Sequence, residues 1–217
     1  MALLFNYIFD PDTPQTTEFR DAVEAAGLFF SNQFTNDVTI NLRIKWASLG
    51  TRFLAKNDGN LNTVPINYTQ LQQYLPNLPT SDPTSGQGHF IITRGEAKAL
   101  GILYPQNSDL DATITFNSDF NWAYDPSQLI GPPSSNGQAD FVATAEHEIS
   151  EVLGRFAFQG SSHLSLTSNP YSVLDLFRYS NSGVPTLHGE TGYFSTDNGI
   201  TRSQWGRGVF QQFFGLR

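Results

Sequence analysis

The chain reads Asp140-Phe-Val-Ala-Thr-Ala-Glu-His-Glu-Ile-Ser-Glu-Val-Leu-Gly-Arg155 over the stretch that decides its fold. Asp140 is a good N-cap residue, because its carboxylate can accept the free backbone N–H groups of a first helical turn. Gly154 allows the chain to break away just past the last turn. Between them, apolar residues recur at steps of three and four, namely Phe141, Ala145, Ile149, Val152 and Phe156. The stretch therefore predicts one helix at the centre of the fold.

A second face of this helix carries groups that can bind a metal. His147 and Glu151 are four residues apart, so their side chains project side by side. Together with Glu148 they form the pattern H-E-x-x-E. Its better known relative is H-E-x-x-H, in which two His bind zinc and the Glu between them is the general base. The alternative is a partly exposed helix on which these three residues form a solvated acidic face.

The spacing after His147 is also that of a longer motif. Gly154 follows His147 by seven residues, as the glycine does in the metzincin motif H-E-x-x-H-x-x-G-x-x-H. Two ligand positions differ, because Glu151 stands in place of the second His and Ala157 in place of the third. A carboxylate ligand puts more negative charge on a metal, so Glu151 indicates an altered metal preference, slow catalysis or a retired site.

Composition restricts the class of protein. The chain has 217 residues, 39% of them hydrophobic, which suits one domain with a sizeable core. Its formal net charge is −8, which argues against a nucleic-acid partner, because phosphate binding needs a basic surface. The chain has no cysteine, so any metal must be held by His, Asp or Glu.

The sequence also bears on whether the protein is exported or cytoplasmic. Residues 1–6 lack the basic region and the long apolar run of a signal peptide. No apolar run is long enough to cross a bilayer, so we expect no membrane span. A polar, weakly charged, acidic composition is typical of exported proteins. We therefore expect a secreted or extracellular protein whose leader is absent from this chain, with a cytoplasmic protein as the alternative.

Periodicity predicts the order of the secondary-structure elements. Strands are expected at residues 3–9, 38–48 and 109–118, a long helix at 17–34, and short helices at 68–75 and 94–100. This order matches a three-layer α/β lobe with a mixed sheet. Beyond Gly154 the regular signal is weak, apart from an apolar segment at 172–179 and a hairpin whose turn is Asn198-Gly199.

Four segments occur here in an order that is familiar: Ala112-Thr-Ile-Thr-Phe-Asn-Ser118, the helix from Asp140, Leu174-Asp-Leu-Phe-Arg-Tyr-Ser180 and Tyr193-Phe-Ser-Thr-Asp197. Together they resemble a family of exported bacterial metallopeptidase-like proteins related to the metzincin clan, whose helix usually reads H-E-I-G-H-A-L-G. The resemblance implies an α/β (α+β) protein of metzincin-like zincin fold, with a twisted mixed sheet and two long helices. It implies one domain over residues 1–217, with an α/β lobe at about 1–155 and an irregular C-terminal lobe at about 156–217.

The resemblance also implies a tight turn beneath the metal. Metzincins have a Met in this turn and a Tyr two residues later. The segment from Tyr171 to Tyr179 stands at the corresponding place, with Leu174 or Leu176 instead of Met. Tyr179 is thus a candidate to stabilise a developing oxyanion.

A catalytic zinc needs three protein ligands and an open position for water, and His147 and Glu151 supply two. The candidates for the third are His163, in a loop after Gly160, and Asp175, within the family-like segment. Asp175 is flanked by apolar residues and needs a partner, since burying an unpaired charge is very costly. That partner is either the metal or an arginine, Arg178 or Arg155. His163 as a plain surface residue is likewise an open alternative.

We therefore expect a metal-dependent endopeptidase that acts on polypeptides with zinc or another divalent metal. The metal would polarise the scissile carbonyl and lower the pKa of its water, and Glu148 would take the proton from that water as general base. The main alternative is a catalytically retired, secreted binding or structural protein. A third is glycan binding through the aromatic loop Phe120-Asn-Trp-Ala-Tyr124.

Overall fold

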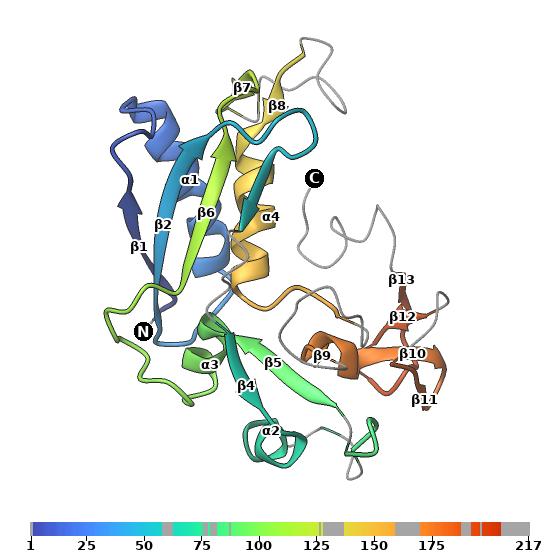
Figure 1. Ribbon diagram of the computed structural model, residues 1–217. Helices are drawn as coiled ribbons and strands as arrows, with labels where there is room; N and C mark the ends of the chain where they lie inside the picture. The colour runs from blue at the N-terminus through green and yellow to red at the C-terminus, as the bar shows by residue number, and fades with distance from the viewer. Residues whose placement is uncertain are drawn as a thin grey trace. The chain divides into compact units, whose positions relative to one another are not determined.

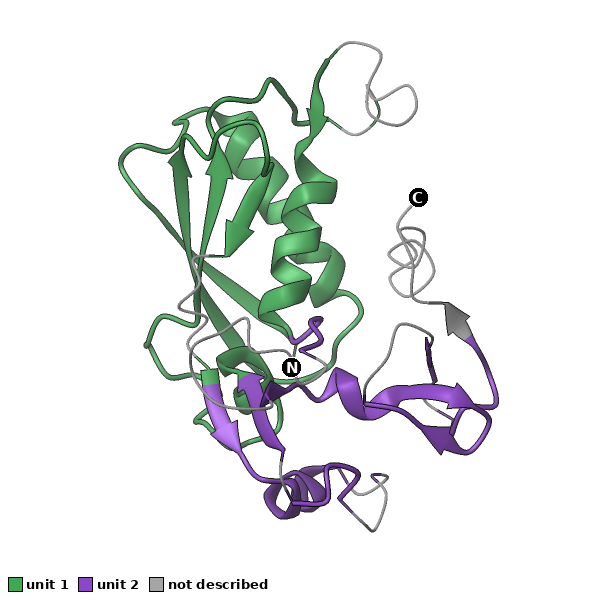
Figure 2. Ribbon diagram, turned by 45° about the vertical axis from the view of Figure 1, so that its right-hand side comes forward, with its two compact units in different colours: residues 1–63, 93–153 green, residues 64–92, 154–217 purple. Residues whose placement is uncertain are grey.

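The computed structural model describes residues 2–57, 63–75, 78, 82–86, 88–125, 127, 137–158, 170–187, 192–195 and 197–204 (Figure 1). The chain divides into two compact units, which Figure 2 shows in different colours. Unit 1 comprises residues 1–63 and 93–153, and unit 2 comprises residues 64–92 and 154–217. Unit 2 thus contains residues 64–92 together with the C-terminal part of the chain.

A four-stranded mixed sheet forms the centre of unit 1. Its order is β1-β2-β6-β3, with β1 at Leu4–Phe9, β2 at Thr39–Ala47, β6 at Ala112–Asn117 and β3 at Ala55–Asn57. β1, β2 and β6 run parallel, whereas β3 is antiparallel to β6 and forms one edge. The three predicted strands and the mixed sheet are confirmed. Sequence periodicity does not predict β3, which is too short to show an alternation.

Two helices, α1 at Thr17–Ser31 and α4 at Phe141–Val152, lie on the same face of this sheet (Figures 1 and 2). They contact each other, and α4 also contacts β3 and β6. The core beneath them includes Ile40, Leu42, Ile44, Ile114 and Phe116, all buried. Alternate residues of β2 thus face inward, as the pattern predicts. α1 ends three residues before the predicted end at Phe34, whose side chain is 40% exposed and contributes little to a buried stripe.

Both ends of α4 follow the local signals in the sequence. The Asp140 carboxylate accepts a hydrogen bond from the Ala143 backbone N–H at 3.0 Å, as an N-cap does. Asp140 also lies in β8, the two-residue strand Ala139–Asp140 that pairs with β7 at Trp122–Ala123. At the other end Gly154 has φ of 104°, a conformation that favours glycine. The predicted helix is confirmed.

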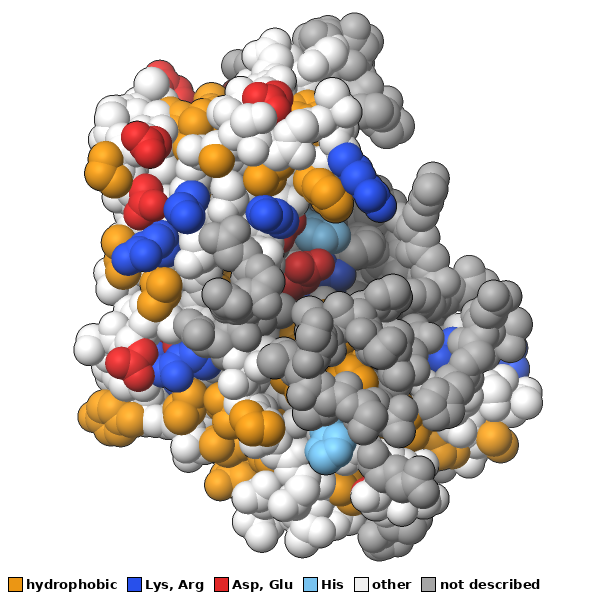
Figure 3. Space-filling view, viewed as in Figure 1, with side chains coloured by type: hydrophobic (Ala, Val, Ile, Leu, Met, Phe, Trp, Pro, Cys, Tyr) orange, Lys and Arg blue, Asp and Glu red, His pale blue; other side chains and the backbone are white. Residues whose placement is uncertain are grey.

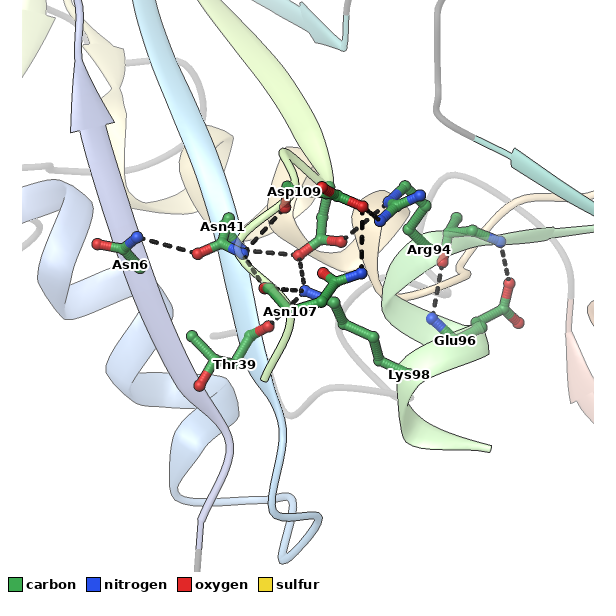
Figure 4. Close-up of polar contacts among 10 residues, drawn as sticks. Asn6, Thr39, Asn41, Arg94, Glu96, Lys98, Asn107 and Asp109 are labelled. Carbon is green, nitrogen blue, oxygen red and sulfur yellow. Dashed lines mark hydrogen bonds and ion pairs between the residues drawn. The ribbon is translucent and has the colours of Figure 1, made fainter. Parts of the chain in front are cut away.

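A buried ion cluster joins β2 to α3, the short helix at Arg94–Ala99 (Figure 4). Lys98 and Asp111 are fully buried and form an ion pair. The Asp111 carboxylate also accepts hydrogen bonds from the Arg94 guanidinium at 3.3 Å and from the Asn41 backbone N–H at 2.8 Å. With several donors for one carboxylate, the cost of removing both charges from water is offset.

The same cluster holds the segment between α3 and β6 against β2. Lys98 donates to the backbone carbonyl of Thr39 at 2.8 Å, and the Asn41 amide donates to the carbonyls of Asn107 and Asp109 at 2.8 and 3.0 Å. Figure 4 shows these groups converging from β2, α3 and the segment before β6. The predicted short helix at 94–100 is confirmed, but its role in this cluster is visible only in the structure.

Unit 2 contains short elements. Its helix α2, at Tyr68–Tyr74, begins at a capping box of Asn67 and Gln70, and this confirms the predicted helix at 68–75. A three-stranded sheet has the order β4-β5-β9, with β4 at Thr63–Ile66, β5 at His89–Thr93 and β9 at Pro170–Tyr171. The first residue of β4, Thr63, and the last residue of β5, Thr93, belong to unit 1.

A second small sheet follows, in the order β11-β10-β12-β13. Its strands are β11 at Val184–Pro185, β10 at Arg178–Asn181, β12 at Tyr193–Phe194 and β13 at Ser203–Gln204. β12 and β13 pair antiparallel, and Asn198 and Gly199 between them have φ of 59° and 80°, so the predicted hairpin is confirmed. The protein is thus a mixed α/β protein. Within the described ranges no helix is long and apolar enough to span a membrane.

Replacing Lys98 by Met should lower the free energy of unfolding by about 3–5 kcal/mol, because the Asp111 carboxylate would lose its fully buried ion-pair partner and keep only the Arg94 guanidinium. Urea unfolding measures this change. Lys56→Met is the matched control, since Lys56 is exposed, and should stay within about 0.5 kcal/mol of the parent. Equal stability of Lys98→Met and the parent would show that the ion cluster does not stabilise unit 1.

Glu96 should make stability depend on pH. Burial raises its pKa from 4.5 to about 7, against hydrogen bonds from Thr93 that lower it. The folded protein therefore binds more protons than the unfolded chain between these two values, and the unfolding free energy falls as the pH rises through this window. Glu96→Gln keeps a capping-box acceptor but cannot ionise.

The melting temperature of Glu96→Gln, minus that of the parent, should therefore be larger at pH 8 than at pH 4. The variant Glu18→Gln, at an exposed position, is measured at the same two pH values as the control. A Glu96→Gln difference that shrinks with rising pH would contradict the raised pKa.

Candidate functional site

α4 brings His147 and Glu151 together. The Nε2 atom of His147 lies 3.1 Å from Oε1 of Glu151, and the side chains are 40% and 31% exposed. The two residues share a face of the helix, as their spacing of four predicts. Figure 3 shows histidine and acidic side chains beside one another on the surface over α4. Neither side chain points into the apolar core.

Glu148 lies deeper than its two neighbours. It is only 6% exposed, and its Oε2 accepts a hydrogen bond from Nδ2 of Asn57 at 3.0 Å. The same nitrogen lies 3.2 Å from Oε2 of Glu151. Residues three apart lie on the same side of a helix. The carboxylates of Glu148 and Glu151 accordingly converge on one amide group.

Asn57 is the residue that sequence reasoning misses. It ends β3, opposite Ile114 of β6, and reaches α4 from the edge of the sheet. Its Oδ1 atom is buried and has no hydrogen-bond partner among the described residues. In the sequence Asn57 reads as the first residue of a turn, because Asn, Asp and Gly follow one another there. A three-residue strand leaves too few positions to reveal which face Asn57 is on.

The negative charge on this helix is moderated by burial. Burial, with a smaller contribution from the nearby charge of Asp140, raises the pKa of Glu146 to about 7. Glu146 is therefore partly protonated at neutral pH. The backbone around the site is held by side-chain hydrogen bonds, from Ser150 to the carbonyl of His147 and from Thr144 to that of Asp140.

The distance between His147 and Glu151 can be compared with the spacing of two ligands on one metal ion. Ligands at about 2.0–2.2 Å from a tetrahedral zinc lie roughly 3.3 Å apart. The observed 3.1 Å between Nε2 and Oε1 is close to this value, so the pair suits two ligand positions as well as a hydrogen bond. Over the described ranges of the chain, no group of three or more His, Asp and Glu side chains is placed to hold a metal. The residues thus fit two of the three protein ligands of a catalytic zinc.

Asp175, one candidate for the third ligand, belongs to unit 2 and is 1% exposed. Its Oδ2 accepts hydrogen bonds from the backbone N–H groups of Ser172 and Phe158 at 2.8 and 3.0 Å, and from the Ser172 hydroxyl at 3.2 Å. These donors stabilise the buried carboxylate and hold the 3-10 helix at Leu174–Phe177. His163, the other candidate, lies outside the described residues.

Tyr179, the candidate oxyanion stabiliser, lies in β10 and is buried. Its ring lies 6.4 Å from that of Tyr193, the residue opposite it on β12. Burial raises its pKa, and the charge of Asp197 adds to the effect, so the phenol stays protonated and able to donate a hydrogen bond. Tyr179 belongs to unit 2.

The aromatic loop at 120–124 packs inward. Trp122 is buried, its indole N–H donates to the Asn117 carbonyl at 2.9 Å, and its ring lies 5.3 Å from that of Phe141. Tyr124 lies 5.0 Å from the same ring. Trp122 therefore belongs to the core of unit 1, and the half-buried Tyr124 packs beside it on Phe141.

A comparison of this chain with protein-family models, with curated proteins and with solved structures finds no match. The candidate site therefore consists of residues of α4 and β3.

Proposed function

We propose that the protein is a metal-dependent peptidase that uses His147 and Glu151 to hold a divalent cation and Glu148 as general base. The observation that carries this proposal is the 3.1 Å contact between His147 and Glu151, with buried Glu148 on the same helix. A solvated acidic face would leave Glu148 exposed and would not require a residue of another element to contact it. Both features favour a built site over a plain helix surface.

Each residue has a distinct part in this proposal. His147 and Glu151 bind the cation, through Nε2 and a carboxylate oxygen. When bound, zinc or a related divalent metal supplies a Lewis acid that polarises the scissile carbonyl and lowers the pKa of water. Glu148 accepts a proton from a water molecule in the site and passes it to the leaving amine. Its position beside an exposed pair, in a poorly hydrated place, suits a group that must gain and lose a proton.

The remaining parts of the expected site stay predictions. They are a third protein ligand, sought in Asp175 or His163, and an oxyanion donor, sought in Tyr179. The metzincin-like family, the zincin fold and secretion belong to the same proposal and are supported only by the residues that carry the resemblance. The mixed sheet with two helices on one face agrees with that fold but is common to many others.

A catalytically retired binding protein is the second candidate. It is favoured by the hydrogen bonds of Asp175, whose Oδ2 already accepts three donors, and by the departure from the H-E-x-x-H pattern at Glu151. The two candidates differ in one measurement. The peptidase should contain a divalent metal by elemental analysis and should cleave casein, with the cleavage abolished by EDTA and restored by Zn²⁺. A retired protein should show no cleavage with any divalent metal.

Two conservative variants separate the general base from the ligand. Glu148→Gln should keep the metal, because both proposed ligands are unchanged, but should lower kcat by at least about 100-fold, since an amide cannot accept the proton. Glu151→Gln should instead lose metal, because a neutral amide is a poor ligand. Metal stoichiometry and peptide hydrolysis are measured on both variants. Parent-like hydrolysis by Glu148→Gln would exclude the general-base role, and parent-like metal content in Glu151→Gln would exclude that ligand.

A further inference from the structure

Asn57 is a side chain from outside α4 that contacts both carboxylates of the site. Its Nδ2 lies 3.0 Å from Oε2 of Glu148 and 3.2 Å from Oε2 of Glu151. It also lies 3.4 Å from the backbone carbonyl of Glu148. The three acceptors belong to one turn of α4, whereas the donor belongs to the edge strand β3.

The contacts offset the repulsion between the carboxylates of Glu148 and Glu151. Carboxylates three residues apart on one helix face repel each other, and the repulsion strengthens when one of them is buried away from water. An amide NH₂ group has two N–H donors and no net charge. It can therefore hold two carboxylate oxygens close together without neutralising either of them.

The orientation of the amide follows from the same chemistry. Carboxylates only accept hydrogen bonds, so the nitrogen of Asn57 must face them, and the reversed amide would place its oxygen against two anions. Oδ1 then points elsewhere, into a buried position without a hydrogen-bond partner in the described structure. A buried acceptor without a donor costs free energy. This cost accompanies the orientation that directs the two N–H groups at Glu148 and Glu151.

We infer that Asn57 is the positioning residue of the site: its amide holds the proposed base Glu148 and the proposed ligand Glu151 in one fixed arrangement. The inference rests on the proposed function. Asn57 itself touches neither the cation nor the substrate. Groups that orient metal ligands in this way typically change metal affinity by 10–100-fold when removed. A purely structural clip between β3 and α4 would change stability instead and leave metal affinity unaltered.

The test uses the full chain with Asn57→Leu, which is nearly isosteric and removes both N–H donors. Asn57→Gln keeps the donors on a longer side chain and should restore part of the effect. Lys56→Leu is the matched control, because Lys56 precedes Asn57 on β3 and its side chain is exposed. Circular dichroism and thermal unfolding show whether each variant folds. Zn²⁺ affinity is measured by competition with a chromophoric chelator, and kcat and KM for a peptide are measured on the zinc-loaded proteins.

A third readout needs no metal. The side-chain amide of Asn57 gives an NMR signal pair that is identified by its loss in Asn57→Leu. In the metal-free protein this pair should shift in both Glu148→Gln and Glu151→Gln, because each variant changes one acceptor.

The inference predicts that folded Asn57→Leu binds Zn²⁺ about 10-fold more weakly than the parent and lowers kcat more than it changes KM. Lys56→Leu should stay within about twofold in both quantities, and Asn57→Gln should lie between the parent and Asn57→Leu. Parent-like Zn²⁺ affinity and kcat in Asn57→Leu would overturn the inference while the proposed function stands. An amide pair that shifts in neither Glu variant would also overturn it. If the parent itself binds no Zn²⁺, the proposed function fails, and the inference that rests on it fails too.

Discussion

The packing of Phe141 against the sheet is the interaction on which the rest of unit 1 depends. Its ring is fully buried and lies 4.5 to 5.3 Å from those of Phe116, Tyr124, Phe19 and Trp122. Burial of such a side chain contributes about 1.5–3 kcal/mol, and each favourable ring pair adds about 0.5–1.5 kcal/mol. Because Phe141 is the first residue of α4, this packing sets the rotation of the helix about its axis. The rotation in turn decides which residues face away from the core.

Two buried carboxylates of unit 1, those of Asp111 and Glu148, are stabilised in different ways. Around Asp111 the charges are of opposite sign, and Lys98 and Arg94 supply donors directly to the carboxylate. Around Glu148 the neighbouring charge is of the same sign, and a neutral amide is the donor. The first arrangement is closed and stabilises the fold. In the second arrangement the donor carries no charge, which suits the proposed cation site.

Much of unit 1 could be predicted from sequence because its signals are local. The stripe on α4, the cap at Asp140, the break at Gly154 and the alternation in β2 each depend on residues close together in the chain. The predicted contact of His147 with Glu151 also follows from helix geometry alone. Asn57 and the pair of Lys98 with Asp111 could not be predicted, because their partners are brought together by strand pairing and helix packing. The grouping of residues 64–92 with unit 2 could not be predicted for the same reason, since no local sequence pattern indicates it.

The distance along the chain between β3 and α4 has a consequence during synthesis. Asn57 and Glu148 are separated by 91 positions, so their contact cannot form until nearly all of unit 1 has left the ribosome. The parallel strands β1, β2 and β6 are complete by Asn117, well before the polar turn of α4 is made. A growing or truncated chain that ends before α4 therefore lacks the helix that carries the three proposed functional residues. The proposed peptidase would be silent until α4 has been made, because His147, Glu148 and Glu151 all lie on that helix.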